Sequence, residues 1–171
     1  MRKVVLNLTM SLDGFIEGPD GEYDWCFTDQ DYGMTHFLAR TDSVFCGRKS
    51  YDLLTRVGDE ILTGKDKYVF SETLTEVEGD WVLVRDQSGE SVRAILNRPG
   101  KDIWLFGGSS LTRHFIQLNL VDEMILSIHP VLLGGGTPMF YPADKRNWLE
   151  VADCKHYNTG LVQITYRFKL R

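Results

Sequence analysis

The chain reads Asp102-Ile-Trp-Leu-Phe-Gly-Gly-Ser-Ser110 in the stretch from which its fold can be worked out. The apolar run at 103–106 predicts a buried strand that ends at two glycines. Leu111, Phe115 and Leu118 follow with the spacing of a single apolar stripe, which predicts a helix directly after the glycines. The glycines would let the backbone approach a ligand closely, and either serine could cap the helix. Ligand binding and plain helix capping explain this stretch about equally well.

A second junction of the same kind lies earlier in the chain. The short apolar strand predicted at 43–46 gives way to Gly47-Arg48-Lys49-Ser50, which opens another predicted helix. The free N–H groups and positive dipole end of such a helix favour an anion, and two cations strengthen the effect. On these four residues alone, an ordinary turn with two solvated cations is the favoured interpretation.

Strands and helices alternate along most of the chain. The remaining patterns predict strands at 4–10, 67–70, 81–84 and 123–133, and helices at 29–40 and 91–97. Apolar and polar residues then alternate from Val162 to Leu170, after a turn at 158–160, so the chain should end in an antiparallel hairpin. We therefore predict an α/β fold with three αβα layers and a mostly parallel central sheet, in a single domain spanning 1–171.

Composition narrows the function. Hydrophobic residues make up 43% and charged residues 25% of the 171, as in an ordinary globular protein, and the formal net charge is −5. This charge disfavours nucleic acid as a partner, and no apolar run is long enough to cross a membrane, so we expect a cytoplasmic protein. Cys26, Cys46 and Cys154 form no CxxC pair, so we expect free, buried thiols and no metal site.

Carboxylates gather near the first turns of the chain. Asp13 follows the first predicted strand, and Asp31 lies at the start of the first predicted helix. A carboxylate in a cleft can keep a raised pKa and act as a proton donor. An aspartate at a helix start is more often a cap, and that interpretation wins on the pattern alone.

In sequence order, these pieces resemble the dihydrofolate-reductase-like superfamily. The resemblance is strongest to the reductase domain of bifunctional riboflavin-biosynthesis enzymes and to stand-alone bacterial relatives of it. The matching stretches, which span nearly the whole chain, are Met10-Ser11-Leu12-Asp13-Gly14, Gly47-Arg48-Lys49-Ser50-Tyr51, Tyr68-Val69-Phe70-Ser71, Ile103-Trp104-Leu105-Phe106-Gly107-Gly108-Ser109 and His129-Pro130-Val131-Leu132-Leu133-Gly134-Gly135-Gly136.

The resemblance implies that NADPH lies across the carboxyl ends of the strands. Thr9 and Ile16 would line the nicotinamide pocket, and Arg48 would meet the 2′-phosphate. Gly107 and Gly108 would pass close to the cofactor through an unusual peptide bond. The other implied cofactor contacts are Gly47, Lys49 and Ser50 at the phosphates, Ser71 near the adenosine, and Ser109, Ser110 and Leu111 at the pyrophosphate.

The resemblance also implies a catalytic acid and a substrate class. Folate-reducing relatives carry an acid on the first helix, which corresponds to Asp31, and Asp13 is the second candidate. The riboflavin-pathway domain usually has a glutamate before its glycine pair, where this chain has Phe106. With the aromatic residues Trp25, Phe27 and Tyr32 flanking Asp31, we expect a flat, mainly apolar heterocycle, and a raised Asp31 pKa.

Two functions from different classes remain open. The first is an NADPH-dependent reductase of a small heterocycle such as a pteridine or pyrimidinone, acting on CH–NH or CH–OH groups. The second is a non-catalytic ligand-binding protein that kept the fold. In either case we expect a homodimer, because riboflavin-pathway relatives pair through their sheets and the strand at 161–170 offers an edge.

Overall fold

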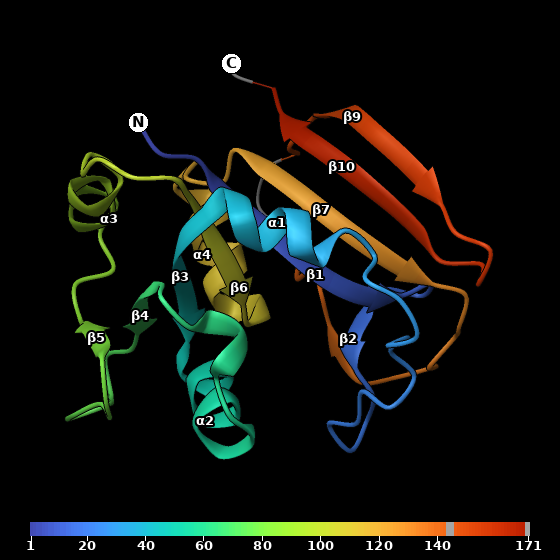
Figure 1. Cartoon of the computed structure of the whole chain (residues 1–171), viewed down its shortest axis with the longest axis horizontal. Helices are drawn as coiled ribbons and strands as arrows, with labels where there is room; N and C mark the ends of the chain where they lie inside the picture. Colours follow the sequence, from blue (N-terminus) through green and yellow to red (C-terminus); the bar gives the residue numbers. More distant parts are fainter. Residues whose placement is uncertain (143–145, 170–171) are drawn as a thin grey trace.

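A sheet of eight strands, in the order β5-β4-β3-β6-β1-β7-β10-β9, forms the centre of the molecule (Figure 1). The structure is a computed structural model that describes residues 1–142 and 146–169. Neighbouring strands from β5 to β7 run parallel, and β10 runs antiparallel to β7 and β9. The strands of this sheet are β1 (Val4–Ser11), β3 (Thr41–Gly47), β4 (Asp66–Phe70), β5 (Trp81–Val84), β6 (Asp102–Gly107), β7 (Glu123–His129), β9 (Leu149–His156) and β10 (Val162–Phe168).

Helices cover both faces of the sheet, which confirms the three-layer α/β prediction. The helices are α1 (Met34–Arg40), α2 (Arg48–Val57), α3 (Gly89–Leu96) and α4 (Ser109–Gln117), with a 3-10 turn at Glu60–Leu62. Val5 of β1 packs in a core with residues of α1 and α2, whereas its neighbours Val4 and Leu6 pack with α3 and α4. Side chains alternate across a strand, so β1 contributes to both cores.

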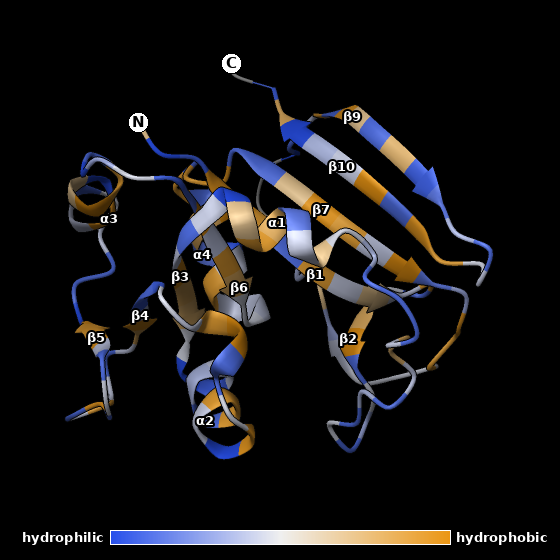
Figure 2. Ribbon diagram, in the orientation of Figure 1, coloured by the Kyte–Doolittle hydropathy of each residue, from blue (hydrophilic) through white to orange (hydrophobic). Residues whose placement is uncertain are grey.

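The C-terminal hairpin forms as predicted, but its outer edge is not the expected one. β10 pairs with β7 on one side and β9 on the other, so β9, and not β10, forms this edge of the sheet. Both strands alternate between hydrophobic and hydrophilic residues in Figure 2. All three cysteines are free, but only Cys46 is buried: Cys26 is half-buried and Cys154 lies exposed on β9, which corrects the expectation of three buried thiols. Leu170 lies outside the described residues.

The first helix is shorter than its sequence pattern suggests. The helical spacing predicted a start near Asp29, but α1 begins at Met34. Tyr32 and Gly33 take left-handed backbone angles, with φ of 48° and 81°, and left-handed residues cannot continue a right-handed helix. Residues 18–33 therefore form a loop at the carboxyl edge of the sheet.

The strand predicted at 123–133 ends early, at His129, and Pro130 follows it. The chain then turns back toward β2, which follows β1. A two-stranded sheet joins β2 (Phe15–Glu17) to β8 (Thr137–Pro138), so the loop after β1 and the loop after β7 are tied together. Among the described residues, no helix is both long enough and apolar enough for a membrane span.

Candidate active site

Two helices begin side by side at the carboxyl edge of the sheet. α2 starts directly after β3 and α4 starts one residue after β6, and these two strands are paired neighbours. α2 packs on one face through Tyr51 and Leu54, whereas α4 packs on the other through Leu111 and Phe115. In open α/β sheets, ligands bind in the crevice where adjacent strands send their helices to opposite faces. By this rule, the carboxyl edge between β3 and β6 is where a ligand is expected, and this edge is called the crevice below.

Glycines bring the two junctions into near contact. A Cβ added to Gly108 would lie 3.6 Å from Ser50 Oγ, and one added to Gly47 would lie 3.7 Å from the Gly107 carbonyl oxygen. Gly107 and Gly108 have φ of 107° and 66°, a region that glycine occupies without strain. The peptide bond between them is trans, so the unusual bond implied by the resemblance is not found.

The electrostatic character of the crevice is that of an anion site. Neither α2 nor α4 has a side chain capping its N-terminal N–H groups, and neither has an acid in its first turn. By contrast, α3 is capped by Ser88 and carries Glu90 in its first turn. The uncapped N–H groups, together with exposed Arg48 and Lys49, would attract a negatively charged ligand.

Arg48 is held toward the loop that follows β4. Its Nη1 donates to Thr73 Oγ1 at 2.9 Å, and its Nε lies 3.5 Å from Asp52. Ser71, which we predicted as an adenosine contact, is buried, and its hydroxyl accepts from the backbone N–H groups of Thr73 and Leu74. Thr73 was missed from the sequence. The signal for it was the Ser-x-Thr pattern after a strand, which is typical of a turn closed by a serine hydroxyl.

Thr9 and Ile16 lie on the other side of the crevice. Thr9 is half-buried near the carboxyl end of β1, and β1 is the neighbour of β6 on the side away from β3. Ile16 belongs to β2 and packs against the core beneath α4. The edge therefore presents, in order, the N-terminus of α2, the glycine pair of β6 with α4, and the end of β1.

Asp13 holds two loops together. Its carboxylate accepts from the Ser11 hydroxyl at 2.6 Å and from the backbone N–H groups of Leu133 and Gly134 at 3.1 and 2.8 Å. These hydrogen bonds, led by the one from Ser11, lower its pKa. The nearby Gly136 packs so closely that a Cβ there would overlap the Glu17 carbonyl. Asp13 is thus an ionised anchor at the carboxyl edge.

Asp31 caps the first helix from the solvent side. Its Oδ1 accepts from the backbone N–H and the hydroxyl of Thr35, at 2.9 and 2.6 Å, and the side chain is exposed. These hydrogen bonds lower its pKa, so the expected rise is wrong. The reason is that the aromatic residues pack elsewhere, with Trp25 and Phe27 against His129.

Comparison with known proteins places this geometry in a family. A family model described as the RibD C-terminal domain matches residues 2–163. The chain belongs to the RibD C-terminal domain family. The match spans both strand–helix junctions and most of the sheet.

Relatives of this RibD C-terminal domain protein match it over almost their whole length. YyaP of Bacillus subtilis, an uncharacterised protein, is 42% identical, and the match covers 98% of this chain and 95% of YyaP. YwjB of the same organism, also uncharacterised, is 30% identical, with 96% and 97% covered.

Solved structures share the fold. A protein of Shewanella sp. PV-4 described as a riboflavin biosynthesis protein superposes with a TM-score of 0.87 at 28% identity, covering 98% of this chain and 99% of that one. The Thermotoga maritima deaminase/5-amino-6-(5-phosphoribosylamino)uracil reductase superposes with a TM-score of 0.77 at 16% identity, covering 98% of this chain and 57% of that one. The dihydrofolate-reductase-like fold predicted from the motifs is confirmed.

The structural role of one residue of this RibD-like domain is evident only from the structure. His129 ends β7, is buried, and accepts a hydrogen bond from the Phe27 N–H through Nε2 at 3.0 Å. Its Nδ1 lies 3.3 Å from the Ser127 carbonyl oxygen, to which it donates. Burial lowers its pKa, partly offset by the Ser127 carbonyl. His129 therefore ties the loop at 23–29 to the carboxyl edge in its neutral form.

Proposed function

We propose that this protein is an NADPH-dependent reductase of a small heterocyclic substrate, acting on a C=N or C=O group. The observation that carries the proposal is the pair of uncapped helix N-termini that meet beside Arg48 at the carboxyl edge. Backbone N–H groups at helix N-termini are suited to phosphate, and a dinucleotide pyrophosphate can contact two of them at once. Membership of the RibD C-terminal domain family supports the same reaction class.

The residues along this edge could contact the successive parts of NADPH. Arg48, oriented by Thr73, would hold the 2′-phosphate, because a guanidinium forms paired charge-assisted hydrogen bonds with phosphate. Thr9 and Ile16 would line the nicotinamide side of the crevice. The pyrophosphate would lie between the two helix starts, against Gly47, Lys49, Ser50, Gly107, Gly108, Ser109, Ser110 and Leu111. When bound, NADPH supplies a hydride.

The proton that completes the reduction would come from water. Asp13 and Asp31 are both held ionised by hydrogen bonds, so neither is suited to donate a proton near neutral pH. Burial raises the pKa of Asp122, but this residue precedes β7 at the opposite edge of the sheet. Hydride addition to carbon and protonation of nitrogen or oxygen by water would give the CH–NH or CH–OH product.

The aromatic loop beside the crevice favours a flat substrate. Trp25 meets the His129 ring edge-on and Phe27 packs against it at a tilt, with ring centroids 5.4 and 4.8 Å away. Phe106, half-buried at the end of β6, packs against Trp104. Aromatic rings at the edges of a crevice favour a planar, mainly apolar heterocycle over a ribosyl chain.

Cofactor binding is the first test. We expect NADPH to bind more tightly than NADH when either is titrated against the intrinsic tryptophan fluorescence. Arg48→Ala should weaken NADPH binding by about 1.5–3 kcal/mol, because a charged hydrogen bond is lost, and should leave NADH nearly unchanged. Arg56→Ala, an exposed arginine in the last turn of the same helix, is the matched control. Equal affinity for both cofactors, or no binding of either, would contradict the proposal.

Turnover distinguishes the reductase from a binding protein. We expect NADPH oxidation with at least one member of a panel of pteridines, pyrimidinones and quinones, followed at the nicotinamide absorbance. The alternative is a non-catalytic NADPH- or ligand-binding protein, and the involvement of both candidate acids in structural hydrogen bonds favours it. Tight NADPH binding without oxidation across the whole panel would support that alternative.

A further inference from the structure

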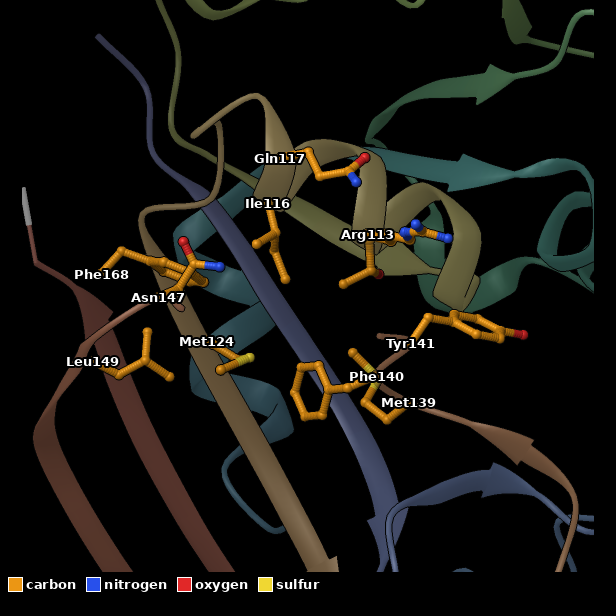
Figure 3. Close-up of a pocket in the computed structure, with 11 residues that line it drawn as sticks. Arg113, Ile116, Gln117, Met124, Met139, Phe140, Tyr141, Asn147, Leu149 and Phe168 are labelled. Atoms are coloured by element: carbon orange, nitrogen blue, oxygen red, sulfur yellow. The ribbon is translucent and has the colours of Figure 1, made fainter. Parts of the chain in front are cut away.

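A cavity lies between α4 and the chain that follows β8 (Figure 3), and it extends along α4 from Thr112 in the first turn to Gln117 at the end. Its volume is about 600 Å³, which falls within the range of small-molecule sites. Met124, near the start of β7, and Phe168, at the end of β10, form part of its floor. The cavity therefore lies on the α4 face of the sheet and reaches the amino end of β7.

The walls of this cavity are mainly apolar. Figure 3 shows side chains from α4, β7, β9 and the segment at 139–141 turned toward one space. The apolar lining residues are Ile116, Met124, Met139, Phe140, Leu149 and Phe168. Methionine and aromatic side chains adapt to the shape of an apolar ligand. Transfer of such a ligand from water to this space is favourable in proportion to the apolar area removed from water.

One buried polar atom beside the cavity has no partner among the described residues. Thr112 lines the cavity from α4 and is 1% exposed, yet its Oγ1 makes no hydrogen bond with any described residue. A buried hydroxyl without a partner destabilises the folded state, because it has lost its hydrogen bonds to water.

An arginine without a partner among the described residues lies at the opening of the cavity. Arg113 is exposed, lines the cavity, and forms no ion pair or hydrogen bond with the part of the chain that the structure describes. An adjoining hollow of about 440 Å³ is lined by Arg113 and by Ser110, His114, Gln117 and Tyr141. In a chain of net charge −5, an unpaired arginine beside an apolar chamber is complementary to an anionic head group.

We propose that this cavity binds an amphipathic anion, with its apolar body in the chamber and its carboxylate, sulfonate or phosphate head at Arg113. This ligand is not the dinucleotide, although the adjoining hollow reaches Ser110, one of the proposed pyrophosphate contacts. A small molecule fits the observations better than a second copy of the chain, because the apolar surface is concave and its only charged rim group among the described residues is a cation.

Calorimetric titration with dodecanoate tests the proposal. We expect one equivalent to bind, and dodecanol, which lacks the charge, to bind about tenfold more weakly, the factor that 1.4 kcal/mol of lost head-group interaction produces. Arg113→Gln should weaken dodecanoate binding about tenfold for the same reason. Arg56→Gln removes an exposed arginine from α2, in the opposite layer, and should leave dodecanoate binding unchanged.

A chamber-filling variant locates the apolar part of the ligand. Ile116→Trp should abolish dodecanoate binding while the circular dichroism spectrum and NADPH affinity are retained. If Ile116→Trp fails to fold, the exposed Arg113→Gln variant still carries the test. No binding by the folded wild type, or equal losses in Arg113→Gln and Arg56→Gln, would overturn the proposal. A dimer of the wild type that Ile116→Trp dissociates would also overturn it, because a second copy would then cover the cavity.

Discussion

His129 makes the stability of this protein depend on pH. Its Nε2 accepts the Phe27 N–H, which requires the neutral ring, and burial lowers its pKa below the ordinary 6.5. The unfolded chain takes up the proton at about 6.5 while the folded protein resists it, so the free energy of unfolding should fall as the pH drops below 6.5. The loss should level off once the pH is below the pKa of the folded state.

The measurement is urea unfolding from pH 7.5 to 5.5 with His129→Gln as the comparison. The glutamine Oε1 can still accept from Phe27 but does not titrate, so the variant should lack the part of the pH dependence that His129 causes. Protonation in the wild type removes a buried hydrogen bond worth about 1 kcal/mol. Identical pH profiles for the two proteins would show that His129 has no such effect.

Asp13 and Asp31 illustrate why single residues are hard to assign from sequence. Both were reasonable proton donors, since an aspartate near a crevice can have a raised pKa. Both instead accept several hydrogen bonds, from Ser11 and Leu133 in one case and Thr35 in the other. The identity of a carboxylate is visible in the sequence, but its pKa depends on neighbours that include residues far along the chain.

The starts of α2 and α4 lack the stabilisation that an acidic first turn provides, and their free N–H groups would favour an anionic ligand. A carboxylate in the first turn of a helix stabilises it by about 0.3–1 kcal/mol, yet neither helix has one, whereas α3 carries Glu90. We therefore expect Ser110→Glu, at an exposed position in α4, to retain or slightly raise the melting temperature. The same change should weaken NADPH binding about tenfold or more, because the new charge would lie close to the phosphates.

Glu90→Gln provides the opposite control at α3. This substitution removes an acid from the first turn of a helix outside the crevice, so it should lower the melting temperature slightly and leave NADPH binding unchanged. A Ser110→Glu protein that binds NADPH as well as the wild type would rule out α4 as a phosphate-binding element.

The whole molecule presents a long free edge that favours pairing with a second copy. β9 has eight residues, and its Val151 is 57% exposed. Open edges with apolar side chains tend to pair with other strands. We therefore expect light scattering to give twice the 19.6 kDa of one chain, and we expect Val151→Lys to give monomers, since a charge on an edge strand opposes pairing.

Val57→Lys is the matched control for the dimer prediction. Val57, at the end of α2, is also 57% exposed but belongs to a helix rather than an open edge. This variant should remain dimeric. A wild-type protein that scatters as a single chain at micromolar concentration would contradict the prediction.

Local pattern was sufficient to predict most of the architecture. Apolar runs and the helical stripe through Leu111 and Phe115 specify strands and helices because burial follows the period of each element. The alternation of strands with helices then predicts a parallel sheet, and the period of two after 161 predicts the final hairpin. The strand–helix junctions at Gly47 and Gly107 could be located for the same reason.

Only the tertiary structure decided which residues meet. The strand order brings β3 beside β6 and so joins two helix starts that lie about sixty positions apart in the chain. Thr73 reaches Arg48, Asp13 binds Leu133, and His129 holds the Phe27 backbone through contacts of this kind. Such contacts depend on the packing of the whole chain, whereas the periodicity of a sequence records only which side of an element is buried.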